Sequence, residues 1–255
     1  MNLYLTADQP LNFLKLLAHD LRWNLLVKLS YSDYRVGELV KSLNQPPNLV
    51  SYHLRRLREH QLVSERRSSA DSRDVYYTLD LDRMSQLYAA IGEALHPALG
   101  GPDATSKTQT EPNVNRPLQV LFLCTHNSAR SQMAEGILRY HGGNQVEAFS
   151  AGNQPSEVRP EAVRTMQALG IDISHHRSKH LDEFIGQSFD YVITVCDQAN
   201  ETCPVFPGDP HRIHWSFHDP SAIEDPKTRI RTYEQIAQEL TRRINFLLIT
   251  ATKHK

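Results

Sequence analysis

A short apolar segment that ends in a cysteine is the feature that most constrains the fold of this chain. Residues 120–123, Val-Leu-Phe-Leu, are typical of a buried strand in a parallel sheet. Cys124 follows at once, Arg130 comes after five intervening residues, and residues 131–135 are predicted to lie in a helix. A strand, a tight loop and a helix N-terminus direct successive backbone N–H groups toward one point. We therefore predict an anion-binding loop directly after the strand.

The residue types in this loop predict its chemistry. The Cys124 thiol should have a pKa below its usual value of about 8.5, because the loop favours the thiolate anion. Arg130 can hold a tetrahedral oxyanion with two parallel hydrogen bonds, and Ser131 can donate its hydroxyl to the sulfur. A structural cysteine before an ordinary helix is the alternative, and the spacing of cysteine, arginine and serine argues against it. The residues predicted to bind the oxyanion are Thr125, His126, Asn127, Ser128, Ala129, Arg130 and Ser131.

The size and composition of the chain exclude several classes of protein. Its 255 residues suffice for two domains, and 40% hydrophobic with 22% charged residues is typical of a soluble globular protein. A net charge of −1 gives no general affinity for nucleic acid, so any DNA contact requires a local basic patch. The N-terminus does not resemble a signal peptide, and no apolar run is long enough to span a bilayer. Because three cysteines without secretory context favour a reducing compartment, we expect a cytoplasmic protein.

The first hundred residues carry a helical pattern that is interrupted by a hairpin. Asn48 is predicted to cap the third of four helices, and a charged turn separates two strands. The helices are expected at residues 11–29, 36–43, 49–61 and 81–99, and the strands at 62–67 and 75–79. Two helices, a tight turn and a basic hairpin in this order are typical of a winged helix-turn-helix. A small helical domain whose arginines merely face solvent is the alternative.

Residues 48–63, NLVSYHLRRLREHQLV, resemble the recognition helix of ArsR-type repressors. The resemblance covers about the first hundred residues and implies a homodimer, formed around the helix at 81–99, that reads double-stranded DNA through the major groove. It implies contacts to base edges from Asn48, Leu49, Ser51 and Tyr52. It implies contacts to phosphates from Arg55, Arg56, Arg66, Arg67 and Arg73.

One departure from these repressors concerns how the domain would be switched. Relatives that sense arsenite carry cysteines near the start of the helix before the recognition helix, whereas this chain has none before Cys124. His19, His53, His60 and His96 show no clear metal-ligand pattern, and most of them are expected at the surface. We therefore predict no metal site, and the inducer stays open.

The second half of the chain alternates strands and helices. Residues 100–117 have almost no large apolar side chain and are predicted to form a flexible linker between a domain at 1–99 and a domain at 118–255. Strands are expected at 146–150, 191–195 and 212–215, and helices at 160–169 and 233–249. This alternation predicts an α/β domain, a parallel sheet with helices on both faces, with the Cys124 loop at its carboxyl edge.

Three further residues are predicted to take part in the chemistry. Cys196 directly follows the strand at 191–195, and Cys203 lies seven residues later in a polar segment. The two cysteines are interpreted as a redox pair rather than as small apolar residues, because all three cysteines fall in this domain and these two flank a polar loop. A zinc site is disfavoured because their spacing fits no zinc knuckle. Asp219 precedes Pro220, which restricts its backbone, and beside a cysteine–arginine loop it is the candidate general acid.

Together, residues 124–131, Cys196, Cys203 and residues 214–220 resemble the thioredoxin-coupled arsenate reductases, which share the fold of low-molecular-weight protein tyrosine phosphatases. Two departures stand out. His126 occupies a loop position where glycine is usual, and Arg177 and Lys179 occupy positions where some relatives have oxygen ligands for a cation. The Lys179 ammonium is a candidate to replace that ion.

This resemblance implies a relay of three thiols with no bound cofactor. Cys124 would attack arsenate held by Arg130, Asp219 would protonate the departing oxygen, and Cys196 and then Cys203 would pass on a disulfide that thioredoxin reduces. Glutaredoxin as the reductant stays open. The alternatives are a phosphatase for phosphotyrosine or small phosphate esters fused to a DNA-binding domain, and a regulator whose second domain is a redox or arsenic sensor.

Overall fold

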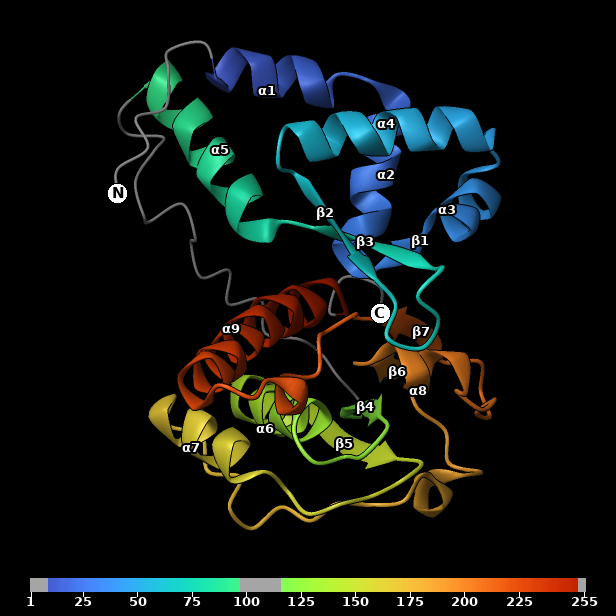
Figure 1. The fold of residues 1–255 in the computed structure, drawn as a ribbon, viewed down its shortest axis with the longest axis vertical. Helices are drawn as coiled ribbons and strands as arrows, with labels where there is room; N and C mark the ends of the chain where they lie inside the picture. Colours follow the sequence, from blue (N-terminus) through green and yellow to red (C-terminus); the bar gives the residue numbers. More distant parts are fainter. Residues whose placement is uncertain (1–8, 97–115, 252–255) are drawn as a thin grey trace. The chain divides into compact units, whose positions relative to one another are not determined.

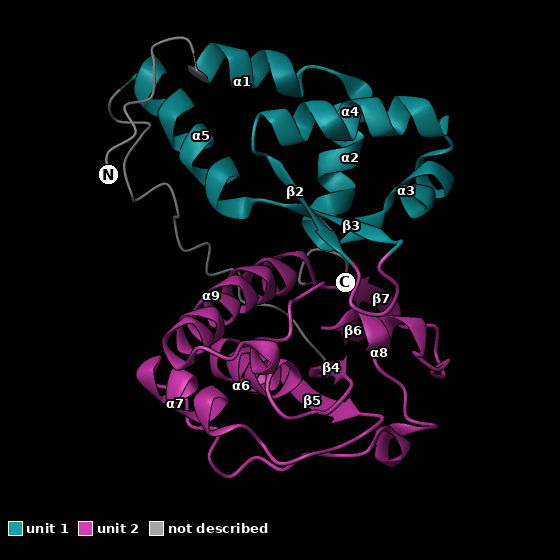
Figure 2. Ribbon diagram, in the orientation of Figure 1, with its two compact units in different colours: residues 1–67, 73–111 teal, residues 68–72, 112–255 magenta. Residues whose placement is uncertain are grey.

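The computed structural model describes residues 9–96 and 116–251, which form two compact units (Figures 1 and 2). The first holds α1 to α5 with a small sheet, and the second holds a larger sheet with α6 to α9. Nearly all of the predicted linker lies outside the described residues. No helix within the described ranges combines the length and apolar character that crossing a bilayer requires.

The first unit has the predicted order of elements. Its helices and strands are α1 (Gln9–Leu17), α2 (Asp20–Tyr31), β1 (Tyr34–Arg35), α3 (Val36–Leu43), α4 (Pro47–Glu59), β2 (Val63–Arg67), β3 (Val75–Leu79) and α5 (Leu81–Leu95). The hairpin of β2 and β3 is confirmed as an antiparallel pair, and β1 joins its other edge to give the order β1-β3-β2. One apolar core, centred on Leu25, Leu39 and Leu54, holds the helices together.

The predicted single helix at 11–29 is wrong, because two helices replace it. α1 ends at Leu17, and the side chain of His19 accepts a hydrogen bond from the Leu21 backbone N–H at 3.2 Å to begin α2. The apolar period continues through this break, since Leu17 and Leu21 are both buried in the same core. The spacing of apolar residues alone therefore could not locate the break between α1 and α2.

The helix predicted at 49–61 is α4, and its inner face is confirmed by the burial of Val50, Leu54 and Leu57. Its start was predicted wrongly. Pro46 is the N-cap and Pro47 the first helical residue, where a missing N–H costs nothing. Asn48 therefore lies inside the first turn and caps nothing. The expectation that most of the four histidines lie at the surface is confirmed for His19, His60 and His96. His53 is buried, with its ring centroid 4.3 Å from that of His19.

The second unit is the predicted α/β domain with a parallel sheet. Strands pair in the order β5-β4-β6-β7, and every pair is parallel. The strands are β4 (Leu118–Cys124), β5 (Val146–Gly152), β6 (Tyr191–Thr194) and β7 (His211–His214). The α-helices are α6 (Arg130–Gly142), α7 (Pro160–Ala168), α8 (Asp197–Glu201) and α9 (Pro226–Ala251), with 3-10 turns η3 (Gly143–Gln145), η4 (Leu181–Phe184) and η5 (Pro220–Ala222). α9 begins earlier than predicted, and α8 was not predicted.

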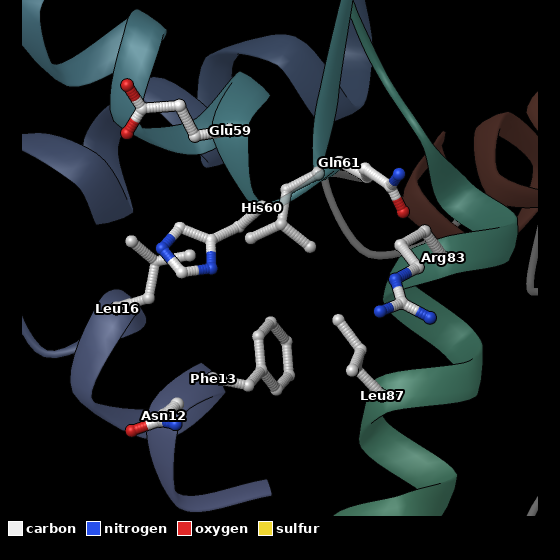
Figure 3. A pocket seen from close by; sticks show the side chains of 9 residues that line it. Asn12, Phe13, Leu16, Glu59, His60, Gln61, Arg83 and Leu87 are labelled. Carbon is white, nitrogen blue, oxygen red and sulfur yellow. The ribbon is translucent and has the colours of Figure 1, made fainter. Parts of the chain in front are cut away.

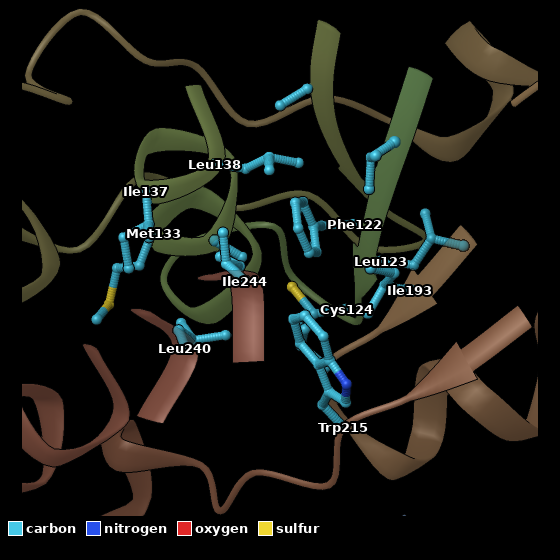
Figure 4. Close-up of a cluster of buried hydrophobic side chains, with 14 of the residues drawn as sticks. Phe122, Leu123, Cys124, Met133, Ile137, Leu138, Ile193, Trp215, Leu240 and Ile244 are labelled. Atoms are coloured by element: carbon cyan, nitrogen blue, oxygen red, sulfur yellow. The ribbon is translucent and has the colours of Figure 1, made fainter. Parts of the chain in front are cut away.

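Both faces of this sheet are covered. Successive residues of a strand point to opposite faces, and Ser150 of β5 contacts Glu135 of α6 whereas Phe149 packs against Phe184 of η4. On the α6 side, Met133 and Ile137 pack in one core with Leu240 of α9 (Figure 4). Packing thus covers both faces of the sheet. Cys124 ends β4 and therefore lies at the carboxyl edge of the sheet.

Candidate active site

The predicted loop connects the end of β4 to the start of α6 and curls around the sulfur of Cys124. The backbone N–H of Asn127 donates to the sulfur at 3.0 Å, and the hydroxyl of Ser131 lies 2.9 Å from it. Cys124 itself is buried. An N–H group, a hydroxyl and the N-terminus of α6 therefore converge on one sulfur, as an anion site requires.

Asn127 holds the loop in this shape. Its backbone adopts a left-handed conformation with φ of +47°, which asparagine tolerates better than most residues. Its amide donates to Ser131 Oγ at 2.9 Å and to Ser150 Oγ at 2.8 Å, and its side-chain oxygen accepts the Lys179 backbone N–H at 2.7 Å. Gln132, which the sequence did not single out, donates to both oxygens of Asn127 at 2.9 Å. The loop is thus tied to α6, to β5 and to the segment before η4.

The backbone of Gly152, at the end of β5, lies so close to this loop that a side chain at this position would not fit. A Cβ atom at this position would lie 2.5 Å from the Thr125 carbonyl oxygen and 2.9 Å from both the Asn127 nitrogen and the Cys124 carbonyl oxygen. All three are backbone atoms, so the loop itself would have to move.

We therefore expect Gly152→Ala to lower turnover about 100-fold, because misplacing a catalytic group by about 1 Å has an effect of this size. It should also reduce the free energy of unfolding by about 1–3 kcal/mol through overpacking. Steady-state kinetics and urea denaturation measure the two effects. Gly37→Ala is the matched control, because a Cβ at that helical position meets nothing within 4 Å. Unchanged turnover in Gly152→Ala would show that the loop tolerates the displacement.

The predicted lowering of the Cys124 pKa is wrong in direction. Burial raises the pKa of this thiol above its ordinary value, and the neighbouring Cys196 adds to the rise. Arg130, the Ser131 hydroxyl and the Asn127 N–H act in the opposite direction without cancelling it. The sequence identifies the groups that stabilise a thiolate, but it does not show how completely the sulfur is removed from water.

Arg130 and Asp219 are brought together as predicted. Arg130 is 7% exposed, and its guanidinium donates to the Phe217 carbonyl oxygen at 2.9 Å. Its second terminal nitrogen lies 3.2 Å from a carboxylate oxygen of Asp219. The other oxygen of Asp219 accepts the Ser221 N–H at 2.9 Å and so begins η5. A half-exposed carboxyl group is thereby fixed beside the arginine of the loop.

The remaining loop residues contribute mainly through their backbones. The carbonyl oxygens of Thr125, His126 and Ser128 accept N–H groups from the segment after β5, at 2.9, 3.0 and 2.8 Å. Ala129 is the buried N-cap residue of α6. The side chain of His126, which stands where glycine is usual, is exposed. The larger residue is therefore accommodated by pointing it away from the buried sulfur.

Cys196 and Cys203 lie on either side of α8, and neither is in a disulfide. Cys196 is buried directly after β6, with its sulfur 3.4 Å from the Thr125 hydroxyl. Cys203 is half-buried, and burial raises its pKa despite the opposing charge of Arg212. The Cys196 thiol thus borders the loop of Cys124, whereas the Cys203 thiol is less deeply buried.

Asp197 is a buried residue that the sequence interpretation missed. It accepts the Ser216 hydroxyl at 2.6 Å, and the same oxygen lies 3.2 Å from Nε2 of His214. Thr194 Oγ1 lies 2.8 Å from the other ring nitrogen of His214. This network fixes the residue after Cys196 to the end of β7. The available signal was an aspartate at the first position of a helix, directly after a cysteine.

Lys179 supplies a positive charge beneath the loop, as the sequence suggested. Its ammonium lies 3.1 Å from a carboxylate oxygen of the buried Glu135 and donates to the Arg177 carbonyl oxygen at 3.3 Å. Arg139 pairs with the other oxygen of Glu135 at 2.7 Å. The side chain of Arg177 is exposed and pairs with Glu183 instead. Within the described residues, no three His, Cys, Asp or Glu side chains are grouped so that they could hold a metal ion.

We expect Lys179→Met to reduce the free energy of unfolding by about 3 kcal/mol, because it leaves a buried carboxylate with one of its two counter-charges. The side chains of Lys179 and Glu135 are 14% and 3% exposed, so water offers little compensation. Urea denaturation measures the loss. The double variant Lys179→Met/Glu135→Gln should regain much of it, and a double variant no more stable than the single one would refute the pairing argument.

The residues predicted to contact DNA lie on the outer face of α4 and on the hairpin. Tyr52 is 51% exposed, and Ser51 shares its face of the helix. Arg55 and Arg56 are exposed and each pairs with Glu59, at 3.6 and 2.9 Å. Exposed positions are also found for Asn48, Leu49, Arg67 and Arg73, whereas Arg66 is half-buried. This placement is compatible with the predicted contacts and does not test them.

The fold and the loop together define an α/β domain built to bring a cysteine nucleophile to an oxyanion. Residues 119–255 match the model of the low molecular weight phosphotyrosine protein phosphatases, and residues 19–65 match that of the arsR family of bacterial regulatory proteins. The first match spans more than half of the chain. The chain therefore belongs to the low molecular weight phosphotyrosine protein phosphatase family.

Individual relatives of the second unit are named arsenate reductases. The arsenate reductase of Halalkalibacterium halodurans is 38% identical over 126 residues, which cover 49% of this chain and 91% of that protein. The arsenate reductase of Brevibacillus brevis is 40% identical over 125 residues, with 49% and 90% covered. A solved structure described as an arsenate reductase in oxidized state is 27% identical, with a TM-score of 0.46 and 52% and 97% covered.

Proposed function

We propose that this chain joins an ArsR-type DNA-binding regulator to an arsenate reductase and serves arsenic resistance in the cytoplasm. The observation that carries the enzymatic part is the placement of Cys196, whose sulfur is 3.4 Å from the hydroxyl of Thr125 in the Cys124 loop. A phosphatase has no use for a second thiol at this place, whereas a reductase that ends in a disulfide requires one. The arsenate reductases among its relatives support the same assignment.

The first step is substitution at arsenic. The Cys124 thiolate attacks arsenate, which is held by the loop N–H groups and the Arg130 guanidinium, and forms an S–As bond. One As–O bond breaks, and Asp219 protonates the departing oxygen so that it leaves as water. The contact of 3.2 Å between Arg130 and Asp219 supports this role for Asp219, because Arg130 is the proposed ligand of the oxyanion.

The second step is the reduction. The Cys196 thiolate attacks the sulfur of Cys124, and the electron pair of the S–As bond stays on arsenic, which leaves as arsenite. Two thiols have then been oxidised to one disulfide, which balances the two electrons gained by arsenic. Cys203 attacks the sulfur of Cys196 and frees Cys124. An external dithiol, for which thioredoxin is our proposal, reduces the remaining disulfide without a cofactor bound to this chain.

Phosphate-ester hydrolysis is the second candidate function, and the Arg130–Asp219 pair favours it as a side activity. The same nucleophile, oxyanion-binding groups and acid would cleave a phosphate ester, with water in place of Cys196 as the second nucleophile. The family membership of the second unit is consistent with this chemistry. Such hydrolysis would not need Cys196 or Cys203.

One set of assays separates the two candidates. Arsenate-dependent NADPH oxidation is measured with thioredoxin and its reductase, and hydrolysis of p-nitrophenyl phosphate is measured in parallel. We expect wild-type protein to turn over arsenate, and Cys196→Ser to stop this turnover while sparing ester hydrolysis. Ester hydrolysis without any arsenate turnover in the wild type would make the second unit a phosphatase.

For the first unit we propose a homodimer that binds double-stranded DNA with the outer face of α4. Exposed apolar side chains on α1 and α5, among them Leu11, Leu14, Tyr88 and Leu95, support an interface between copies. Sedimentation of the full chain tests the dimer. Binding to DNA from its own promoter at several salt concentrations tests the regulator, and Arg55→Ala should reduce the dependence of log affinity on log salt by about one unit.

A further inference from the structure

A cavity of about 250 Å³ lies within the first unit, between α1, the end of α4 and α5. Its apolar lining comes from Phe13 and Leu16 of α1, Leu62, and Leu87 of α5. In Figure 3 the Phe13 ring, the Leu87 side chain and the Arg83 guanidinium point toward a common space. An engineered apolar cavity of about 150 Å³ binds benzene, so this one has room for an aromatic ring and a small polar group.

Arg83 gives the cavity its chemical character. The Nε atom of this arginine is buried, and it has no hydrogen-bond partner among the described residues. Leaving a buried donor of a charged group unpaired is costly, and native proteins rarely retain one without a use. Its guanidinium can hold a carboxylate or a tetrahedral oxyanion with two parallel hydrogen bonds. A charged donor without a partner therefore faces an apolar space.

The acidic residue among the described lining residues already has partners. Glu59 forms ion pairs with Arg55 and Arg56 on the outer side of α4. The other polar lining residues, Asn12, His60 and Gln61, offer hydrogen-bonding groups but no carboxylate. None of the described lining residues thus neutralises Arg83, whereas an anionic group on a ligand would do so.

We propose that this cavity is an effector site for a small organic oxyanion, with an aromatic or branched apolar body against Phe13 and Leu87 and its anionic group on Arg83. Such a site needs no thiol, which agrees with the absence of cysteines before Cys124. It also borders the last turn of α4, so a ligand in the cavity contacts the same helix that carries the proposed DNA-binding face.

Calorimetric titration of the full chain with phenylphosphonate and with benzoate tests the site. Both probes carry a phenyl body, and they differ in presenting a tetrahedral or a planar oxyanion. We expect saturable binding of at least one probe at one Arg83-dependent site per chain, and a loss of affinity at that site of at least tenfold in Arg83→Gln. Leu87→Phe, which fills the cavity and keeps the arginine, should weaken the same probe by a similar factor.

Two control variants assign any binding to its place. Arg58→Gln removes an arginine of the same unit that pairs with Glu65 and lies outside the cavity, and it should leave affinity unchanged within twofold. Arg130→Gln removes the oxyanion ligand of the Cys124 loop, a second place where phenylphosphonate can bind, and it should leave the binding that depends on Arg83 unchanged. Binding that is lost in Arg130→Gln and kept in Arg83→Gln would overturn the proposal, as would wild-type protein that binds neither probe.

Discussion

Cys203→Ser is expected to abolish continuous arsenate reduction while leaving a single turnover intact. Without this thiol, Cys196 can still attack Cys124 and release one arsenite per protein, but the resulting disulfide stays between two buried residues. Thioredoxin attacks disulfides it can reach, so the steady-state rate should fall by at least about 100-fold, as for loss of an essential nucleophile. Rapid-quench measurement of arsenite, with and without thioredoxin, gives both quantities.

Cys196→Ser provides the contrast that makes this result specific. It should stop the reaction one step earlier, with arsenic still bonded to Cys124 and no arsenite released, whereas Cys203→Ser should release it in a burst. Mass spectrometry of the quenched proteins distinguishes a Cys124–arsenic adduct from a Cys124–Cys196 disulfide. Normal multiple turnover in Cys203→Ser would remove Cys203 from the proposed relay.

Arg130→Lys is expected to lower kcat for arsenate by about 10²–10³-fold, the usual effect of removing one donor from an oxyanion site. A lysine keeps the positive charge but lacks the planar guanidinium group. Its single ammonium group cannot contact the oxyanion, the Phe217 carbonyl oxygen and Asp219 at the same time. Steady-state kinetics with arsenate and with p-nitrophenyl phosphate should show losses of similar size, since both reactions use the same oxyanion site.

Arg116→Lys is the matched control for this substitution. Arg116 is exposed and pairs with Asp190 at 2.6 Å. It lies two residues before β4, near the opposite end of that strand from Cys124. Its replacement should leave kcat within twofold of wild type. A loss in Arg130→Lys no larger than that in Arg116→Lys would show that the guanidinium is not a ligand of the substrate.

The sequence predicted the elements of this protein better than their ends. The strand that ends at Cys124 and the helix that follows could be placed because an apolar run and a change of period are local signals. The start of α4 at Pro47 was missed because two prolines were interpreted only as a break, although proline is favoured at the first position of a helix. The break before α2 was missed because one core accepts apolar residues from both helices.

The site residues were predictable where chemistry restricts residue type, and less so where burial decides. Cys124, Arg130, Asp219 and Cys196 could be selected as candidates, because few residue types can serve as nucleophile, oxyanion ligand or acid. Asp197 was not, since its role depends on His214 and Ser216, which only the paired strands bring to it. The direction of the Cys124 pKa likewise depends on burial, which no short motif encodes.

The ion pair between Lys179 and Glu135 has a consequence for how the catalytic loop responds to its surroundings. A dissolved cation occupies a site according to its concentration, and it exchanges with every other ion of similar size and charge. The Lys179 ammonium is part of the chain, so it is present once in each folded molecule, and sodium or potassium ions do not displace it. Reaction rates that are equal in sodium and in potassium buffers of the same ionic strength are therefore what this arrangement implies.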